Sequence, residues 1–118
     1  LKVMRGGPVE TARGFLLHSS EFIRKDTVKI DPAFSITGTI DALKSIAEGN
    51  APDKMLFILG YAGWGAGQLD HEIQDNAWLV GDADPVLVFD ARPEDKWDRA
   101  AQKIGVSAAT LSGTAGRA

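Results

Sequence analysis

The chain has 118 residues with a formal net charge of −3; 44% of them are hydrophobic and 25% are charged. This ordinary composition predicts a folded globular protein and argues against disorder, and the length suits one domain. The longest apolar run, residues 55–59, is far shorter than the roughly 20 residues that a transmembrane helix needs. Cysteine is absent, which excludes disulfides and thiolate chemistry and is compatible with a reducing compartment, so we expect a cytoplasmic protein.

Charge is unevenly distributed along the chain. Residues 31–118 hold thirteen Asp/Glu against seven Lys/Arg, a net charge of −6. Nonspecific nucleic-acid binding rests on many Lys/Arg contacts with phosphates, and no helix-turn-helix pattern with a basic second helix is present. Direct binding to nucleic acid is therefore disfavoured, which leaves a protein or a small ligand as the partner. Membrane association is not predicted, and the sequence does not set the oligomeric state.

Strands and one helix are predicted in the first half of the chain. Residues 6–8 predict a turn, and short apolar or alternating runs predict strands over 15–18, 27–30 and 34–36. A helix follows, which we expect Thr37 or Thr39 to cap and Gly49 to end. Its expected apolar face is made of Ile40, Leu43, Ile46 and Ala47. The run 55–59 predicts an inner strand of the sheet.

The second half of the chain predicts two more helices. One covers about residues 66–76, and the other begins at Pro93 and ends at Gly105. Their expected buried faces are Leu69, Ile73 and Ala77 in the first, and Trp97, Ala101 and Ile104 in the second. Residues 78–80 predict a strand, whereas residues 84–89 fit either a helical turn or a strand. The small, polar residues 112–118 are expected to be loosely held.

The most distinctive segment is the glycine-rich stretch that follows the run 55–59. A strand, a glycine-rich turn and a helix are the layout by which backbone N–H groups bind phosphate. Residues 60–67 nevertheless lack the Lys and Ser/Thr of a Walker loop, and Asp70 and Glu72 would repel a phosphate. A structural interpretation is favoured, in which the glycines allow the helix to pack closely on the sheet beneath Trp64.

Two patterns of polar residues invite a catalytic interpretation. Asp70, Glu72 and Asp75 with His18 offer ligands for Mg²⁺ or Mn²⁺, as a metal-dependent hydrolase or nuclease acting on nucleic acid or nucleotides would need. No metal-binding motif accompanies them, so no metal site, cofactor or catalytic residue is predicted. His18 and Ser19 point to opposite faces of a strand and cannot form a catalytic pair, which favours a hydrogen-bonded structural histidine.

The residues favour binding over catalysis. Gln68 and Glu72 share one helical face at a spacing of four residues, and the rings of Tyr61, Trp64 and Trp78 are expected to approach the glycine-rich loop. Flanking glycines leave the ring of Trp64 poorly covered by neighbouring side chains. The predicted binding residues are Tyr61, Trp64, Gln68, Glu72 and His18.

Motifs spread over nearly the whole chain carry a family resemblance. They include Gly6-Gly7-Pro8-Val9, Leu17-His18-Ser19, Gly60-Tyr61-Ala62-Gly63-Trp64-Gly65, Gly67-Gln68-Leu69 and Asn76-Ala77-Trp78. Together they resemble the AlgH (YqgE) family of bacterial proteins. The resemblance implies an α+β fold with a mixed, strongly bent sheet that is partly closed as a barrel and flanked by helices. It also implies that residues 1–118 form a single AlgH-like domain without the family's N-terminal segment, and it suggests regulation of transcription as the function.

Overall fold

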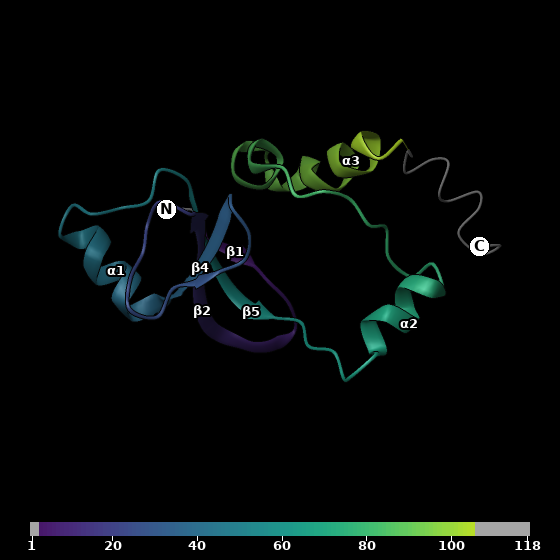
Figure 1. Ribbon diagram of the computed structural model, residues 1–118, viewed down its shortest axis with the longest axis horizontal. Coiled ribbons are helices and arrows are strands. Elements are labelled where there is room, and N and C mark those ends of the chain that lie inside the picture. The colour runs from purple at the N-terminus through teal and green to yellow at the C-terminus, as the bar shows by residue number, and fades with distance from the viewer. Residues whose placement is uncertain (1–2, 106–118) are drawn as a thin grey trace. The chain divides into compact units, whose positions relative to one another are not determined.

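The computed structural model describes residues 3–105, which fall into two compact units divided between Gly63 and Trp64 (Figure 1). Each unit is described by itself. The single domain expected for residues 1–118 stays a prediction, and the closing residues 112–118 lie outside the described part. Among residues 3–105, no helix is both long and apolar enough to cross a bilayer.

A five-stranded sheet forms the body of the first unit. Its strands are β1 (Val3–Arg5), β2 (Val9–Ser19), β3 (Val28–Lys29), β4 (Phe34–Gly38) and β5 (Met55–Tyr61), in the order β1-β5-β2-β4-β3. The β1–β5 pair is parallel, and the other three pairs are antiparallel. The predicted mixed α+β class is confirmed, and the apolar run 55–59 lies in an inner strand as expected.

The sheet is open, so the expected partial closure into a barrel is corrected. Among the described residues, β1 and β3 are the two edges, and no ladder joins them. The edge strands have three and two residues, which leaves few backbone groups with which to close the sheet.

Strand β2 is bent near its start. Its register with β5 shifts between Val9 and Gly14, and Glu10 adopts a positive φ of 44°. A residue other than glycine with such a φ is strained, and a register shift of this kind bends a strand and increases its twist. Figure 1 shows the resulting curve of β2. This irregular segment bends β2, and the strong bend expected for the whole sheet stays a prediction.

Helix α1 (Thr39–Ala47) follows β4 directly and packs against β2 and β4. Neither threonine caps it, because the N-cap residue is Gly38 and no side chain makes a capping hydrogen bond there. The predicted apolar face is partly wrong: Ile46 packs against the core, but the buried residues of the helix are Ala42 and Ser45, and Ile40 is 84% exposed. The predicted end is confirmed. Gly49 has φ +92° and its N–H bonds the carbonyl of Ile46, while Asn50 N–H bonds that of Ser45, as in a Schellman motif.

The core of this unit lies between α1 and the sheet. It is built on Leu16, Phe22 and Ala42, with Ile46, Met55 and Phe57 packed against them. Leu16 is fully buried in the central strand β2. Burial of apolar side chains from one sheet face and one helix is what holds such a layer together.

The glycines of the predicted turn and of the end of β5 allow two backbone segments to touch. A Cβ on Gly7 would stand 2.3 Å from the carbonyl carbon of Tyr61, and one on Gly60 would stand 2.5 Å from the carbonyl oxygen of Gly7. By contrast, a Cβ on Gly63 would meet no described atom within 4 Å. The glycines thus bring the 6–8 turn against residues 60–61, and the expected packing of the helix on the sheet beneath Trp64 stays a prediction.

The second unit contains α2 (Gln68–Gln74), a single π-helical turn η1 (Val86–Asp90) and α3 (Pro93–Lys103). Both helices occur where they were predicted, and residues 84–89 take the helical alternative. The strand expected over residues 78–80 does not form. The predicted faces are partly wrong, because α2 has no buried residue and Trp97 on α3 is 55% exposed; Ala101 is buried as expected.

Candidate functional site

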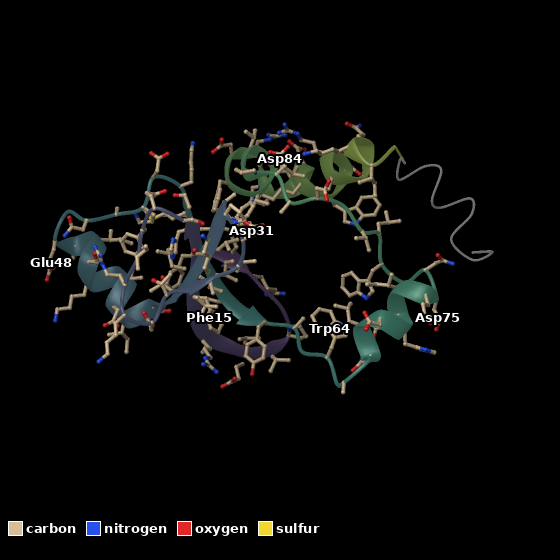
Figure 2. The ribbon with its side chains drawn as sticks, in the orientation of Figure 1. Phe15, Asp31, Glu48, Trp64, Asp75 and Asp84 are labelled. Atoms are coloured by element: carbon tan, nitrogen blue, oxygen red, sulfur yellow. The ribbon has the colours of Figure 1, made fainter. Side chains whose placement is uncertain are left out.

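Four side chains of the second unit form one hydrogen-bonded cluster around the carboxylate of Glu72. Its Oε1 accepts the indole N–H groups of Trp78 at 2.7 Å and Trp64 at 3.2 Å. Its Oε2 accepts the amide N–H of Gln68 at 2.9 Å. We call this cluster of Trp64, Gln68, Glu72 and Trp78 the tryptophan corner. Figure 2 shows Trp64 beside α2, with its side chain directed toward the helix.

Two turns hold the tryptophan corner in place. On the N-terminal side, Gly65 N–H donates to Gln68 Oε1 at 2.9 Å, which anchors the loop carrying Trp64 to the first turn of α2. On the C-terminal side, Asn76 has φ +63° and its N–H bonds the carbonyl of Ile73, while Ala77 N–H bonds that of Glu72. This Schellman motif reverses the chain just after α2. It places Trp78 near Glu72, six residues away along the chain.

The two indole rings are fixed but not covered. Trp64 and Trp78 meet edge to face, with centroids 5.7 Å apart and planes at 68°. Trp64 is 39% exposed and Trp78 is 49% exposed. Tryptophans are usually placed so that most of the ring is buried. Here the polar edge of each ring is bonded to Glu72 while much of the apolar surface stays in contact with solvent.

The hydrogen bonds of the corner lower the pKa of Glu72. The largest cause is the bond from Trp78, followed by those from Gln68 and Trp64, and all of them favour the ionised carboxylate. Because the folded-state pKa is below the ordinary 4.5, the stabilisation that the carboxylate provides is complete above the ordinary pKa. It is lost as the pH falls through the lowered pKa.

We expect the indole N–H signals of Trp64 and Trp78 to titrate together, with one midpoint below 4.5, because both groups donate to the same oxygen. The measurement is an acid titration followed by ¹⁵N–¹H NMR, with the indole of Trp97 as an internal reference. Separate midpoints for the two indoles, or a shared midpoint at or above 4.5, would contradict the bonding described for the corner.

The predicted binding residue Tyr61 belongs to the first unit, where it ends β5. Its hydroxyl donates a short hydrogen bond to the carboxylate of Glu10, which also accepts from Arg13 at 3.3 Å. The bond to Glu10 raises the pKa of Tyr61, and the same bond is the largest cause of the lowered pKa of Glu10. The Tyr61 ring meets Phe15 edge to face at 6.2 Å. Tyr61 therefore braces the strained Glu10 of the bent strand.

His18 also lies in the first unit and is fully buried. Its Nδ1 faces the carbonyl oxygen of Ser19 at 2.8 Å, and its Nε2 faces the hydroxyl of Thr37 at 2.7 Å. A carbonyl only accepts, so Nδ1 carries the proton, and in a neutral ring Nε2 accepts from Thr37. The hydrogen bonds continue beyond Thr37. The hydroxyl oxygen of Thr27 lies 2.7 Å from that of Thr37, and it accepts the backbone N–H of Arg24 at 2.8 Å. These contacts are those of a structural histidine, and a binding role for His18 stays a prediction.

The geometry gives no support to the metal-dependent alternative. His18 has both ring nitrogens engaged, and Glu72 accepts the N–H groups of three side chains. Asp75 is instead 3.3 Å from His71, which lies four residues before it. Within residues 3–105, no group of three or more His, Asp or Glu side chains is arranged to hold a metal ion. The N–H of Gly65 is likewise taken by Gln68, so it is not open to a phosphate.

Three surface hollows of the first unit have volumes of about 350, 410 and 760 Å³. The largest is lined by Val3, Met4, Arg5, Gly7, Pro8, Thr11 and Leu59. None of the five predicted binding residues lines any of these three hollows. The predicted site residues thus separate into a buried histidine, a strand-end tyrosine and the exposed tryptophan corner.

The fold and the corner define a mixed α+β protein with an open sheet and an exposed aromatic and acidic cluster. A family model described as AlgH-like matches residues 1–109, so the chain belongs to the AlgH-like family. The family resemblance read from the sequence is confirmed.

Relatives of known sequence and structure agree with this assignment. A UPF0301 protein of Bradyrhizobium sp. (strain BTAi1) is 56% identical over all of this chain and 55% of its own length. One from Rhodopseudomonas palustris (strain HaA2) is 55% identical over the same shares. The solution structure of the AlgH protein from Pseudomonas aeruginosa is 44% identical and covers 98% of this chain and 61% of that one, with a TM-score of 0.76. The chain thus spans little more than half the length of the curated relatives it matches.

Proposed function

We propose that residues 1–118 form a single AlgH-like domain of a cytoplasmic protein. The protein regulates transcription by binding and not by catalysis. The observation that carries the proposal is the tryptophan corner, where two indoles and an amide are bonded to one exposed carboxylate. Exposed tryptophans held in a defined geometry are typical of recognition surfaces, because they bury large area at little cost in side-chain entropy. The corner is therefore the contact surface, with Tyr61 as a further candidate.

Charge decides between the ways in which such a protein could act on transcription. Residues 31–118 have a net charge of −6, which opposes the phosphates of nucleic acid. The regulation we propose accordingly passes through a protein partner or a small ligand. The one ionisable group of the corner is Glu72, and the three hydrogen bonds that lower its pKa also make its carboxylate a weaker base and nucleophile, which favours binding over catalysis.

The test is complementation of a strain that lacks the full-length gene, with the transcript profile as the readout. We expect Trp64→Ala and Glu72→Gln to lose regulation, because the first removes an exposed ring and the second removes the charge that fixes both rings. Trp97→Ala is the matched control, since Trp97 is an exposed tryptophan of the same unit outside the corner. A wild-type transcript profile from both corner variants, at wild-type protein level, would reject the proposal.

A further inference from the structure

The stretch of chain that contains the tryptophan corner is rich in acidic residues. Residues 55–91 include six acids and no Lys or Arg. The acids are Asp70, Glu72, Asp75, Asp82, Asp84 and Asp90. Asp84 is paired with Lys103 at 2.6 Å, and Asp75 with His71. Asp70 and Glu72 lie on α2 itself. Negative charge beside a binding surface attracts a partner of the other sign and raises the rate of encounter, so it favours a cationic partner.

The two rings of the corner add a second reason for a cation. An indole face carries the negative lobe of the ring quadrupole and attracts ammonium and guanidinium groups. The ring edges of Trp64 and Trp78 are occupied by Glu72, so what each ring presents to solvent is mainly its apolar surface. Because both rings are held by the same oxygen, their positions are set before a partner arrives. Such preorganisation lowers the entropy cost of binding.

Glu72 itself retains room for one more donor. An ionised carboxylate offers about four lone-pair positions. The described contacts use three of them: two on Oε1, for Trp64 and Trp78, and one on Oε2, for Gln68. One position on Oε2 is left, which a single N–H of a cation would fill.

The surroundings of the corner distinguish a protein segment from a small ion. Leu79 is 44% exposed and Val80 is 67% exposed, and they follow Trp78 directly. A lone ammonium ion would leave this apolar surface in water, whereas a peptide with apolar side chains beside its cation would cover it. Contiguous exposed apolar surface of this kind marks protein interaction sites.

We propose that the tryptophan corner binds an arginine or lysine side chain of a partner protein segment, with the cation against the indole faces and one N–H bonded to Glu72 Oε2. The apolar neighbours of that cation lie on Leu79 and Val80. The inference rests on the binding function proposed above and adds the chemical class of the partner.

The experiment is a titration of the ¹⁵N-labelled full-length protein followed through its indole N–H signals. The probe is a short capped peptide with a central arginine flanked by leucines. Two matched peptides carry lysine or the neutral isostere citrulline in place of the arginine. A third probe is tetramethylammonium ion alone. We expect the arginine and lysine peptides to shift the signals of Trp64 and Trp78 saturably and to leave Trp97 in place. Citrulline should weaken binding by about 3- to 30-fold, the range of a cation–π contact.

A variant of the corner checks the role of the carboxylate. Glu72→Gln should weaken binding of both peptides, because the rings lose the charge that fixes them, and it should weaken the arginine peptide more, because only the guanidinium also loses an ionic partner. Equal affinity of the arginine and citrulline peptides for the unaltered protein, the absence of any shift, or equal shifts at Trp97 would overturn the proposal. Tetramethylammonium binding as tightly as the peptides would overturn its assignment to a protein segment.

Failure of this inference and failure of the proposed function give different results. If corner variants lose regulation in cells but no cationic peptide binds, the function stands and the partner is of another class. If the peptides bind as described but the variants regulate normally, the cation site stands and the regulatory role is rejected.

Discussion

Gly60→Ala is expected to reduce the free energy of unfolding by about 3 kcal/mol, combining left-handed backbone strain with overpacking. Gly60 has φ +80°, a conformation that costs an L-residue with a side chain roughly 1–2 kcal/mol. Its new Cβ would also stand 2.5 Å from the carbonyl oxygen of Gly7 and 3.3 Å from Thr11 Cα. Both are backbone atoms, so relief requires the turn and the start of β2 to move away from β5. Urea denaturation measures the loss.

Gly49→Ala separates the two causes. Gly49 has φ +92°, but a Cβ there would meet no described atom within 4 Å. We therefore expect a loss of only about 1 kcal/mol, from backbone conformation alone. Similar losses for the two variants would show that the 6–8 turn is not tightly packed against residues 60–61, contrary to the structure.

Thr37→Val is expected to destabilise the first unit by about 1–3 kcal/mol, the usual cost of a buried polar group left without a partner. Valine has the shape of threonine but no hydroxyl. The Nε2 atom of fully buried His18 would lose its bond, and the hydroxyl of Thr27 would lose its contact with Thr37. The measurement is again the free energy of unfolding in urea.

The matched variant Thr37→Ser keeps the hydroxyl and removes one methyl group. We expect it to lose about 0.8 kcal/mol or less, the value of one buried methylene-sized group. If valine were tolerated as well as serine, the chain of hydrogen bonds through His18 would contribute nothing to stability, and this part of the account would be wrong.

The sequence predicted the elements better than the faces they bury. Residues 55–59 formed an inner strand because a continuous apolar run suits burial on both sides. The helix beginning at Thr39 showed why faces are harder. Its periodicity predicts Ile40 and Ile46 on the buried face, but only Ile46 packs against the core, and the small residues Ala42 and Ser45 are the buried ones. Periodicity gives several overlapping stripes on a short helix, and only the packed neighbour selects one of them.

Residues 78–80 illustrate a different limit. Trp78, Leu79 and Val80 have strand-forming side chains, but the structure contains no strand there. The Schellman motif at Asn76 reverses the chain, and Trp78 bonds to Glu72 instead of joining a ladder. Strand preference depends on having a partner strand, which three residues cannot specify. The asparagine after α2 was the available signal, since asparagine tolerates the left-handed conformation that ends a helix.

The candidate site was predictable in part for similar reasons. The pairing of Gln68 with Glu72 follows from a spacing of four residues on a helix, and the structure has it at 2.9 Å. Exposure of Trp64 followed from its flanking glycines. The convergence of both indoles on one oxygen did not follow, because it depends on the two turns that bracket α2. Likewise, the Tyr61–Glu10 bond depends on the irregular start of β2, which no local sequence pattern predicts.

The most direct test of the account is hydroxyl-radical footprinting of the full-length protein, comparing the oxidation of Trp64, Trp78 and Trp97 in cells with that in the purified protein. If the tryptophan corner is a binding surface, oxidation of Trp64 and Trp78 should fall several-fold in cells, while that of Trp97, which is 55% exposed, should not. Glu72→Gln should abolish the difference. If the ratio of oxidation in cells to oxidation in the purified protein were the same for Trp64, Trp78 and Trp97, the claim that the protein binds through this corner would be contradicted.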